Sequence, residues 1–238
     1  MSVTQPLSPE YQKKLNIFLL RTSKPGEKAV IRSRRKVVQH AAAFQYMVNA
    51  FVKQDKKMTE GLIKDTHAIL VKGLSTEEAG IVSGIDFAGT CRHKTVHAGA
   101  VEMTKPSDIP GAMKSMVSRL QEDLAEVEVS GQIDPFMLAA KYCDRFVNMH
   151  PFKDANGRMC RLILNAFLIK YAGIVVPLGK KSDDRADELQ IAQESSKVGG
   201  YSGQLRTLVL TKASIALKKI LRTLKRQSSG NVSVSILR

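Results

Sequence analysis

The sequence has little that would direct the chain out of a reducing cytoplasm. Its three cysteines, Cys91, Cys143 and Cys160, form no C-x-x-C pair, and their odd number argues against a disulfide framework. The first residues lack the charged and apolar regions of a secretory signal. The most apolar stretch, 162–178, is interrupted by polar residues and glycine and is short for a membrane span. We therefore expect no transmembrane segment and a cytoplasmic location, with the nucleus as the alternative.

Acidic side chains are scarce at both ends of the chain. Residues 1–57 hold 12 basic and 3 acidic side chains, 195–238 hold 9 basic and none acidic, and the middle, 58–194, holds 16 basic and 19 acidic. The net charge of +15 therefore belongs to the ends. Solvated helix faces explain such ends, and the alternative is a patch that binds nucleic acid or anionic lipid. Base stacking has little support because no aromatics are interleaved with these charges, which argues against nucleic acid.

Aromatic residues make up only 5% of the chain, strand-like alternation is scarce, and helical periodicity dominates. The pattern predicts an all-α fold with one β-hairpin in the glycine-spaced stretch 80–99. It also predicts a flexible tail beyond Gln227. In the last helix it predicts an inward face made of Leu210, Ala213, Leu217, Ile220, Leu221 and Leu224. The predicted helices cover 35–53, 59–72, 110–128, 135–150, 157–171 and 204–226. Three regions follow: a basic N-terminal helical region (1–57), a core (58–195), and a basic C-terminal helix with its tail (196–238).

The segment 150–161 carries the chemistry of the sequence. It reads His-Pro-Phe-Lys-Asp-Ala-Asn-Gly-Arg-Met-Cys-Arg and lies between the end of one predicted helix and the start of the next. A short loop that opens into a helix leaves backbone N–H groups available to an anionic phosphate. Arg158 and Arg161, one turn apart, add bidentate partners for phosphate oxygens.

Asp154 and His150 complete this site. A carboxylate beside an anion site implies a cation between them, and Mg²⁺ has that place in nucleotide sites. A histidine at the loop entrance is suited to act as a general base, because its pKa lies near neutrality. The residues alone therefore predict phosphoryl or nucleotidyl transfer by attack of a hydroxyl.

This segment resembles the signature of the Fic family, His-Pro-Phe-x-Asp/Glu-Gly/Ala-Asn-Gly-Arg-x-x-Arg, at every specified position. The similarity extends over about 58–180, where the flanking helices and the upstream hairpin follow the family's order. The resemblance implies a Fic-like helical bundle that transfers AMP from ATP, with Mg²⁺, to a Ser, Thr or Tyr hydroxyl of a target protein.

The resemblance also implies the role of each residue. His150 would deprotonate the attacking hydroxyl, and Asp154 would hold Mg²⁺ between the α- and β-phosphates. Arg158 would bind the β-phosphate and Arg161 the γ-phosphate, while Phe152 would anchor the loop. The other nucleotide-binding positions would be Lys153, Ala155, Asn156 and Gly157, with Asn156 on the α-phosphate. Adenine contacts would come from about 185–197.

The hairpin near 89–99 is similar to the family's flap, which docks the target through main-chain hydrogen bonds. Its docking residues here would be Thr95, Val96 and His97. Gly89-Thr90-Cys91-Arg92 resembles the Gly-x-aromatic-Arg sequence that precedes this flap, except that Cys91 replaces the aromatic residue.

Many members carry an inhibitory helix of pattern Ser/Thr-x-x-x-Glu-Gly/Asn, whose glutamate pairs with the second arginine of the signature. The only Glu followed by Gly or Asn here is Glu60-Gly61, and Lys56 stands where Ser or Thr is required. We therefore predict that inhibition in cis is absent or altered. An inhibitory partner or an oligomer acting in trans is the remaining route to inhibition.

Three alternatives stay open from the sequence. A lone inward-facing histidine is more often a core residue than a catalytic one, and it is the surrounding segment that favours catalysis. The same site could transfer another phosphate-containing group, as a phosphotransferase or from another nucleotidyl donor. The chain could also be a catalytically silent scaffold whose basic ends bind nucleic acid.

Overall fold

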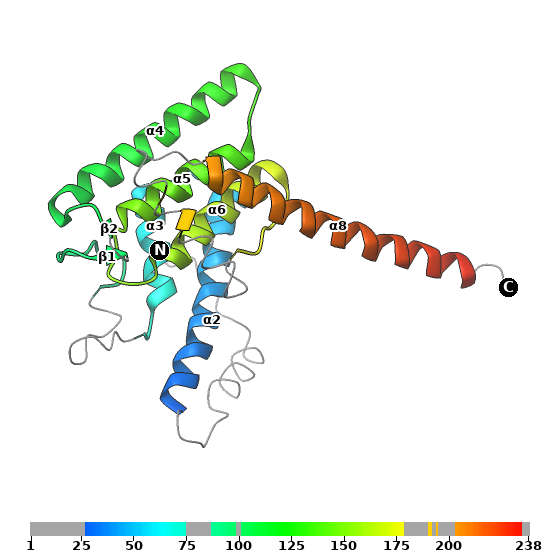
Figure 1. The fold of residues 1–238 in the computed structure, drawn as a ribbon, viewed down its shortest axis with the longest axis horizontal. Helices are drawn as coiled ribbons and strands as arrows, with labels where there is room; N and C mark the ends of the chain where they lie inside the picture. Colours follow the sequence, from blue (N-terminus) through cyan, green and yellow to red (C-terminus); the bar gives the residue numbers. More distant parts are fainter. Residues whose placement is uncertain are drawn as a thin grey trace. The chain divides into compact units, whose positions relative to one another are not determined.

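The fold is predominantly helical, as the sequence predicts. We describe a computed structural model of the chain, in which residues 27–74, 87–98, 101–178, 190–191, 194 and 203–234 are defined. Its α-helices are α2 (Glu27–Met47), α3 (Glu60–Val71), α4 (Ile109–Ser130), α5 (Pro135–Met149), α6 (Asn156–Ala172) and α8 (Gly203–Val234) (Figure 1). A π-helical turn, Val48–Lys53, follows α2, and a 3-10 turn, Pro106–Asp108, precedes α4. The all-α prediction is confirmed.

Two helix starts are capped as their residue types dictate. The Thr59 side chain accepts a hydrogen bond from the N–H of Leu62 at 3.1 Å, so α3 begins at the following residue. The Asp134 carboxylate accepts from the N–H groups of Phe136 and Met137 at 3.0 and 2.9 Å, with Pro135 as the first residue of α5. The predicted Asp134 cap is therefore confirmed.

The hairpin is small and lies within the predicted stretch and just beyond it. Strands β1 (His97–Ala98) and β2 (Val101–Glu102) pair antiparallel, with His97 opposite Glu102. The N–H of Met103 donates to the carbonyl of Val96 at 3.1 Å, which extends the pairing by one residue on each side. The residue just before β1 therefore pairs with the residue just after β2.

The chain divides into two compact units, and the division falls within α5 and α6. The first unit comprises residues up to Ser130 together with Phe146–Leu162. It contains α2 packed against α3, and it also contains the whole loop between α5 and α6. Its fully buried large side chains include Met47, Phe51, Ile63, Leu70, Ile109, Met113, Phe146, Phe152 and Met159. The candidate site is therefore built within this one unit.

The second unit comprises Gly131–Arg145 and the residues from Ile163 onward. The Tyr142 and Phe167 rings pack with their centroids 6.1 Å apart. The side chain of Asn165 accepts from the N–H of Val176 at 2.7 Å and donates to its carbonyl at 3.1 Å, so a buried amide fixes the segment after α6. The ion pair between Arg206 and Asp134, at 2.6 Å, holds the first turns of α8 to the start of α5.

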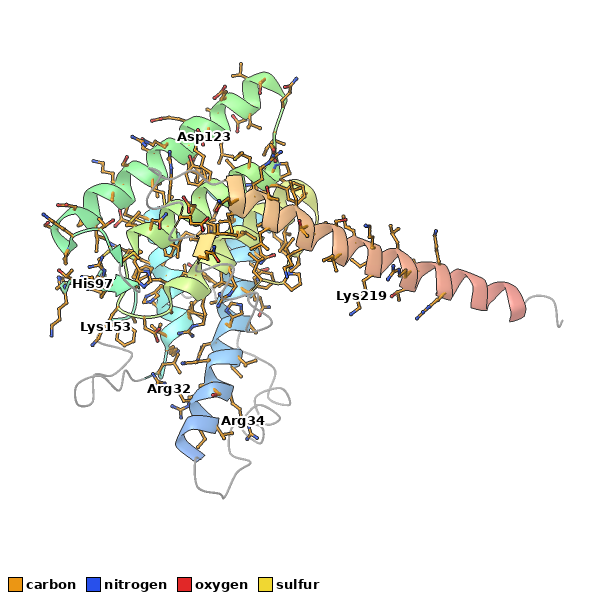
Figure 2. All side chains as sticks on the ribbon, viewed as in Figure 1. Arg32, Arg34, His97, Asp123, Lys153 and Lys219 are labelled. Atoms are coloured by element: carbon orange, nitrogen blue, oxygen red, sulfur yellow. The ribbon has the colours of Figure 1, made fainter. Side chains whose placement is uncertain are left out.

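Helix α8 differs from its prediction in two respects. It continues past the predicted end at residue 226 as far as Val234, so residues 228–234 of the predicted tail are helical. Its first half is buried at Leu205, Val209 and Ala213, whereas four residues predicted to face inward are 42–56% exposed: Leu217, Ile220, Leu221 and Leu224. Periodicity identified an apolar face, but it could not show where the supporting core ends. Figure 2 shows the basic side chains along this helix, Lys219 among them.

The cysteines also differ from expectation. Cys91 is a free cysteine, whereas Cys143 and Cys160 are disulfide-bonded. The expectation of no disulfide framework is therefore wrong for these two residues, because the spacing of cysteines in a sequence does not show which of them become oxidised. Among the described residues, none of the helices combines the length and the apolar composition that a membrane span requires. The cytoplasmic location stays a prediction, and the cysteine count no longer supports it.

Candidate active site

The loop between α5 and α6 turns sharply at both of its ends. His150 has φ +49° and Ala155 has φ +68°, both in the left-handed region that residues with a Cβ rarely adopt. The His150 N–H still donates to the carbonyl of Phe146, which closes the last turn of α5 before the chain leaves the helix. These two turns place residues 151–154 across the N-terminal end of α6.

Replacing Ala155 by glycine is expected to raise the free energy of unfolding by about 0.5–1 kcal/mol. Relief of the left-handed strain is worth about 1–2 kcal/mol, and the greater freedom of glycine in the unfolded chain offsets part of that gain. Urea unfolding measures the difference. Ala125→Gly, at an exposed position of α4, is the matched control and is expected to lower the same quantity by about 1 kcal/mol. A destabilised A155G variant would contradict the strain argument.

The inside of the loop is held by Phe152 and Asn156. Phe152 is fully buried, as the predicted anchor requires. The Asn156 side chain accepts from the Phe152 N–H at 3.0 Å and donates to the Phe152 carbonyl at 2.7 Å, so one amide fixes both backbone groups. The structure thus gives Asn156 a role in shaping the loop, and its contact with an α-phosphate stays a prediction.

Asp154 and Arg158 lie side by side at the start of α6. A guanidinium nitrogen of Arg158 lies 3.4 Å from the Asp154 carboxylate, whose other oxygen accepts from the N–H of Ala155. Arg158 also donates to the carbonyl of Leu70 at 3.4 Å, near the end of α3. Burial lowers the pKa of Arg158, and the Asp154 carboxylate opposes that shift. The Asp154 side chain is 38% exposed, so it is accessible to a cation.

A contact with the backbone orients the His150 ring. Its Nδ1 lies 3.3 Å from the carbonyl of Val147, and because a carbonyl can only accept, Nδ1 carries the proton of this hydrogen bond. Nε2 is then the nitrogen that can take up a proton. Burial lowers the pKa of His150, the Val147 hydrogen bond opposes this shift, and the positive charge of Arg92 adds to it. The imidazole is therefore neutral at pH 7, as a general base must be.

Positive charge reaches the site from α2 as well as from α6. Burial lowers the pKa of His40, which lies on α2, and the charges of Arg161 and Arg158 lower it further. In turn, the charge of Arg32, also on α2, contributes to lowering the pKa of Arg158. Figure 2 shows Arg32 on α2, far from the loop in sequence. From the sequence, the basic residues at 32–36 were interpreted as a solvated helix face or as part of a patch for nucleic acid or anionic lipid. Neither interpretation placed Arg32 near Arg158. Together these groups make the environment of the Arg158 and Arg161 side chains suited to an anion.

Arg92 connects the segment before the hairpin to the loop. Its Nε donates to the carbonyl of His150 at 2.7 Å, and its backbone N–H donates to the carbonyl of Pro151 at 2.9 Å. The two remaining guanidinium nitrogens donate to the carbonyls of Lys94 and Thr104. Arg92 is buried and was not among the predicted site residues, although its place in the Gly-x-x-Arg sequence was a usable signal.

The other predicted residues lie around this loop. The Lys153 ammonium lies 5.9 Å from the centroid of the Phe87 ring, so it points toward the segment that precedes the hairpin. A Cβ at Gly157 would lie 3.8 Å from a guanidinium nitrogen of Arg161, which places that arginine beside the first turn of α6. Thr95 and His97 are exposed and Val96 is half-buried, next to or within β1. Adenine contacts were expected at 185–197, of which only 190–191 and 194 lie within the described residues.

The loop thus brings together a helix N-terminus, two arginines in the first turns of α6 and a histidine whose pKa is lowered, and comparison with known proteins identifies the class. The Fic/DOC family matches residues 57–168. A Fido domain-containing protein of Dictyostelium discoideum is 28% identical over 138 residues, which cover 58% of this chain and 94% of that protein. The protein adenylyltransferase Fic of Drosophila willistoni is 30% identical over 96 residues, 40% of this chain and 18% of that protein.

Solved structures agree on the fold. A Fic domain containing signaling protein from Bacteroides thetaiotaomicron superimposes with a TM-score of 0.61 at 20% identity, covering 93% of this chain and 90% of that one. Residues 57–168 therefore form a domain of the Fic/DOC family, as the family match shows. The chain spans less than one fifth of the Drosophila relative, so the activity of that larger protein is not transferred to this chain by similarity alone.

Proposed function

We propose that this chain transfers AMP from ATP to a Ser, Thr or Tyr hydroxyl of a target protein. The observation that carries the proposal is the His150 imidazole, which is neutral and has its Nδ1 proton directed at the Val147 carbonyl. His150 precedes the start of α6 by six residues, and the first two turns of that helix carry Arg158 and Arg161. A base that faces an anion site is the arrangement that in-line attack on a phosphate requires.

In this mechanism Nε2 of His150 accepts the hydroxyl proton as the acceptor oxygen bonds to the α-phosphorus. The bond from that phosphorus to the oxygen bridging to the β-phosphate breaks, and pyrophosphate leaves. Arg158 and Arg161 offset the negative charge on the departing phosphates. The backbone N–H groups at the start of α6 are oriented toward the same charge.

The donor set fits a magnesium ion that is shared with the nucleotide. Mg²⁺ is commonly held by one or two carboxylates together with substrate phosphates and water, and the exposed Asp154 carboxylate supplies one such ligand. No cluster of three or more His, Cys, Asp or Glu side chains able to hold a metal occurs among the described residues, which is consistent with an ion that arrives with its nucleotide. When bound, Mg²⁺ would neutralise charge on the phosphates.

Labelled ATP tests the proposal and distinguishes it from transfer of another group. We expect protein to become labelled from ATP carrying the label in the α-phosphate, in the presence of Mg²⁺, and not from ATP labelled in the γ-phosphate. Mass spectrometry of the purified protein should find AMP adducts on hydroxyl side chains. Label from the γ-phosphate alone would indicate phosphotransfer. If no label and no Mg-ATP binding were found, while nucleic acid bound in a salt-sensitive manner, the scaffold alternative would replace the enzyme.

Removal of the Glu60 charge is expected to leave self-modification unchanged within about twofold. Glu60 is engaged on its own helix, where its carboxylate lies 2.7 Å from the Lys64 ammonium. Such an exposed pair is worth well under about 1 kcal/mol, so Glu60→Gln should fold normally. The rate of α-phosphate labelling measures the effect, with Glu126→Gln on α4 as the matched control. A gain of tenfold or more in E60Q alone would show that Glu60 inhibits the site.

A further inference from the structure

His67, on α3, is a buried histidine outside the segment that carries the family signature. Its side chain is fully buried, and its two ring nitrogens both have backbone partners. Nδ1 accepts from the N–H of Gly89 at 3.0 Å, and Nε2 lies 3.1 Å from the carbonyl of Asp154. Because an N–H can only donate and a carbonyl can only accept, both bonds require the neutral tautomer with its proton on Nε2.

Packing fixes the ring in this orientation. The imidazole stacks on Phe152 with 3.7 Å between ring centroids and 8° between ring planes. Phe87 lies nearby, with its centroid 6.3 Å from that of the imidazole. Rotation of the ring would break both hydrogen bonds and the stacking with the loop anchor. The Gly89 N–H and the Asp154 carbonyl are therefore held at the separation that one imidazole ring sets.

The partners of His67 belong to the two parts of the site that must stay aligned. Asp154 is the carboxylate residue of the loop, and Gly89 begins the segment that leads into the hairpin. Gly89 has φ +68°, and a Cβ there would lie 3.0 Å from the carbonyl oxygen of Lys64, so the segment approaches α3 as closely as glycine permits. Arg92, three residues further on, is tied to the other end of the loop at His150.

We propose that His67 is a positioning residue, which holds the start of the hairpin segment and the Asp154 turn at a fixed spacing through its two backbone hydrogen bonds. The inference rests on the proposed function, in which the loop binds the nucleotide, and on the docking of the acceptor by the hairpin that the family resemblance implies. His67 and Arg92 then fix the two ends of the loop against one segment. A change in this spacing would move the acceptor hydroxyl relative to the α-phosphate without removing any group that contacts the nucleotide.

Three substitutions separate the two hydrogen bonds. His67→Phe keeps the ring stacking and loses both bonds, His67→Asn keeps an acceptor near Nδ1, and His67→Gln keeps a donor near Nε2. In H67F we expect the rate of self-modification at saturating Mg-ATP to fall by about tenfold or more, while the KM for ATP changes by less than about threefold. H67N and H67Q should fall between H67F and the wild type.

The matched control is Thr66→Val on the same helix. Thr66 is fully buried and donates to the carbonyl of Leu62 at 2.7 Å within α3, without reaching the loop. T66V therefore also removes a buried side-chain hydrogen bond from α3. We expect its transfer rate to remain within about twofold of the wild type. If T66V and H67F slow transfer equally, His67 has only a structural role and the proposal is overturned.

Two measurements do not depend on the reaction. Long-range nitrogen–proton correlation NMR should show the His67 ring with bare Nδ1 and protonated Nε2 at pH 7. The Gly89 amide should be protected from hydrogen exchange in the wild type and H67N, and lose protection in H67F and H67Q. The opposite tautomer, or an unprotected Gly89 amide in the wild type, would overturn the proposal even if AMP transfer is confirmed. Conversely, absence of AMP transfer with this tautomer present would refute only the proposed function.

Discussion

Replacement of His150 by alanine is expected to lower the rate of AMP transfer by about a thousandfold, to the limit of detection. Loss of a positioned general base costs about 10²–10⁴ in rate. Nucleotide binding should be nearly unchanged, since the proposed phosphate ligands are the arginines and backbone N–H groups of α6, not His150. The labelling rate with α-phosphate-labelled ATP measures the first effect, and calorimetry with Mg-ATP measures the second.

The matched control is His93→Ala, because His93 is an exposed histidine of the segment before the hairpin. It should label at the wild-type rate.

Burial also lowers the pKa of His150 below 6.5, so the neutral base persists at pH values where an ordinary histidine is already protonated. The rate should therefore hold down to pH 6.5 and fall only at lower pH. Label persisting in H150A would show that another group takes the proton.

Acidification is expected to cost the folded protein about 3 kcal/mol through His67 alone. Burial lowers the pKa of His67 from 6.5 to about 4, with the positive charge of Arg158 adding to the shift, and the hydrogen bond to the Asp154 carbonyl and the charge of its carboxylate opposing it. Between these values the unfolded chain binds a proton that the folded chain does not. This contribution is therefore fully present above pH 6.5 and is lost progressively as the pH falls to about 4.

Urea unfolding at pH 7, 5 and 4 measures this effect as a difference between variants. H67F should be less stable than the wild type at pH 7, and the gap should shrink by about 3 kcal/mol on going to pH 4, because phenylalanine does not titrate. T66V is the control and should lose stability with pH in parallel with the wild type. Parallel curves for H67F and the wild type would contradict a depressed pKa at His67.

Features encoded by neighbouring residues could be predicted from the sequence. Three such features depend on groups within a few positions of one another: the Asp134 cap with Pro135, the helix predicted over 59–72 and observed as Glu60–Val71, and the buried face of α6. Cap chemistry and the 3.6-residue period act over these distances, so no knowledge of the fold was needed. In the loop at 150–161 the resemblance predicted Phe152 as the anchor, and Phe152 is buried, whereas the bonds of Asn156 to the Phe152 backbone were found only in the structure.

Contacts between residues far apart in the chain could not be predicted in this way. The His67–Asp154 bond spans 87 positions and the Arg92–His150 bond spans 58. Three further features depend equally on packing. They are the charge that Arg32 of α2 adds near Arg158, the disulfide-bonded state of Cys143 and Cys160, and the exposure of the second half of α8.

The sequence by itself therefore determined which groups we propose to bind phosphate and to take up a proton, because those groups lie in one continuous segment. Only the tertiary structure decided what holds that segment in place. A hydrogen bond has a direction and a length of about 3 Å, and whether a distant donor meets these conditions depends on how α2, α3 and the hairpin segment pack around the loop. Periodicity gives the face of a helix, but not the residue that lies opposite it.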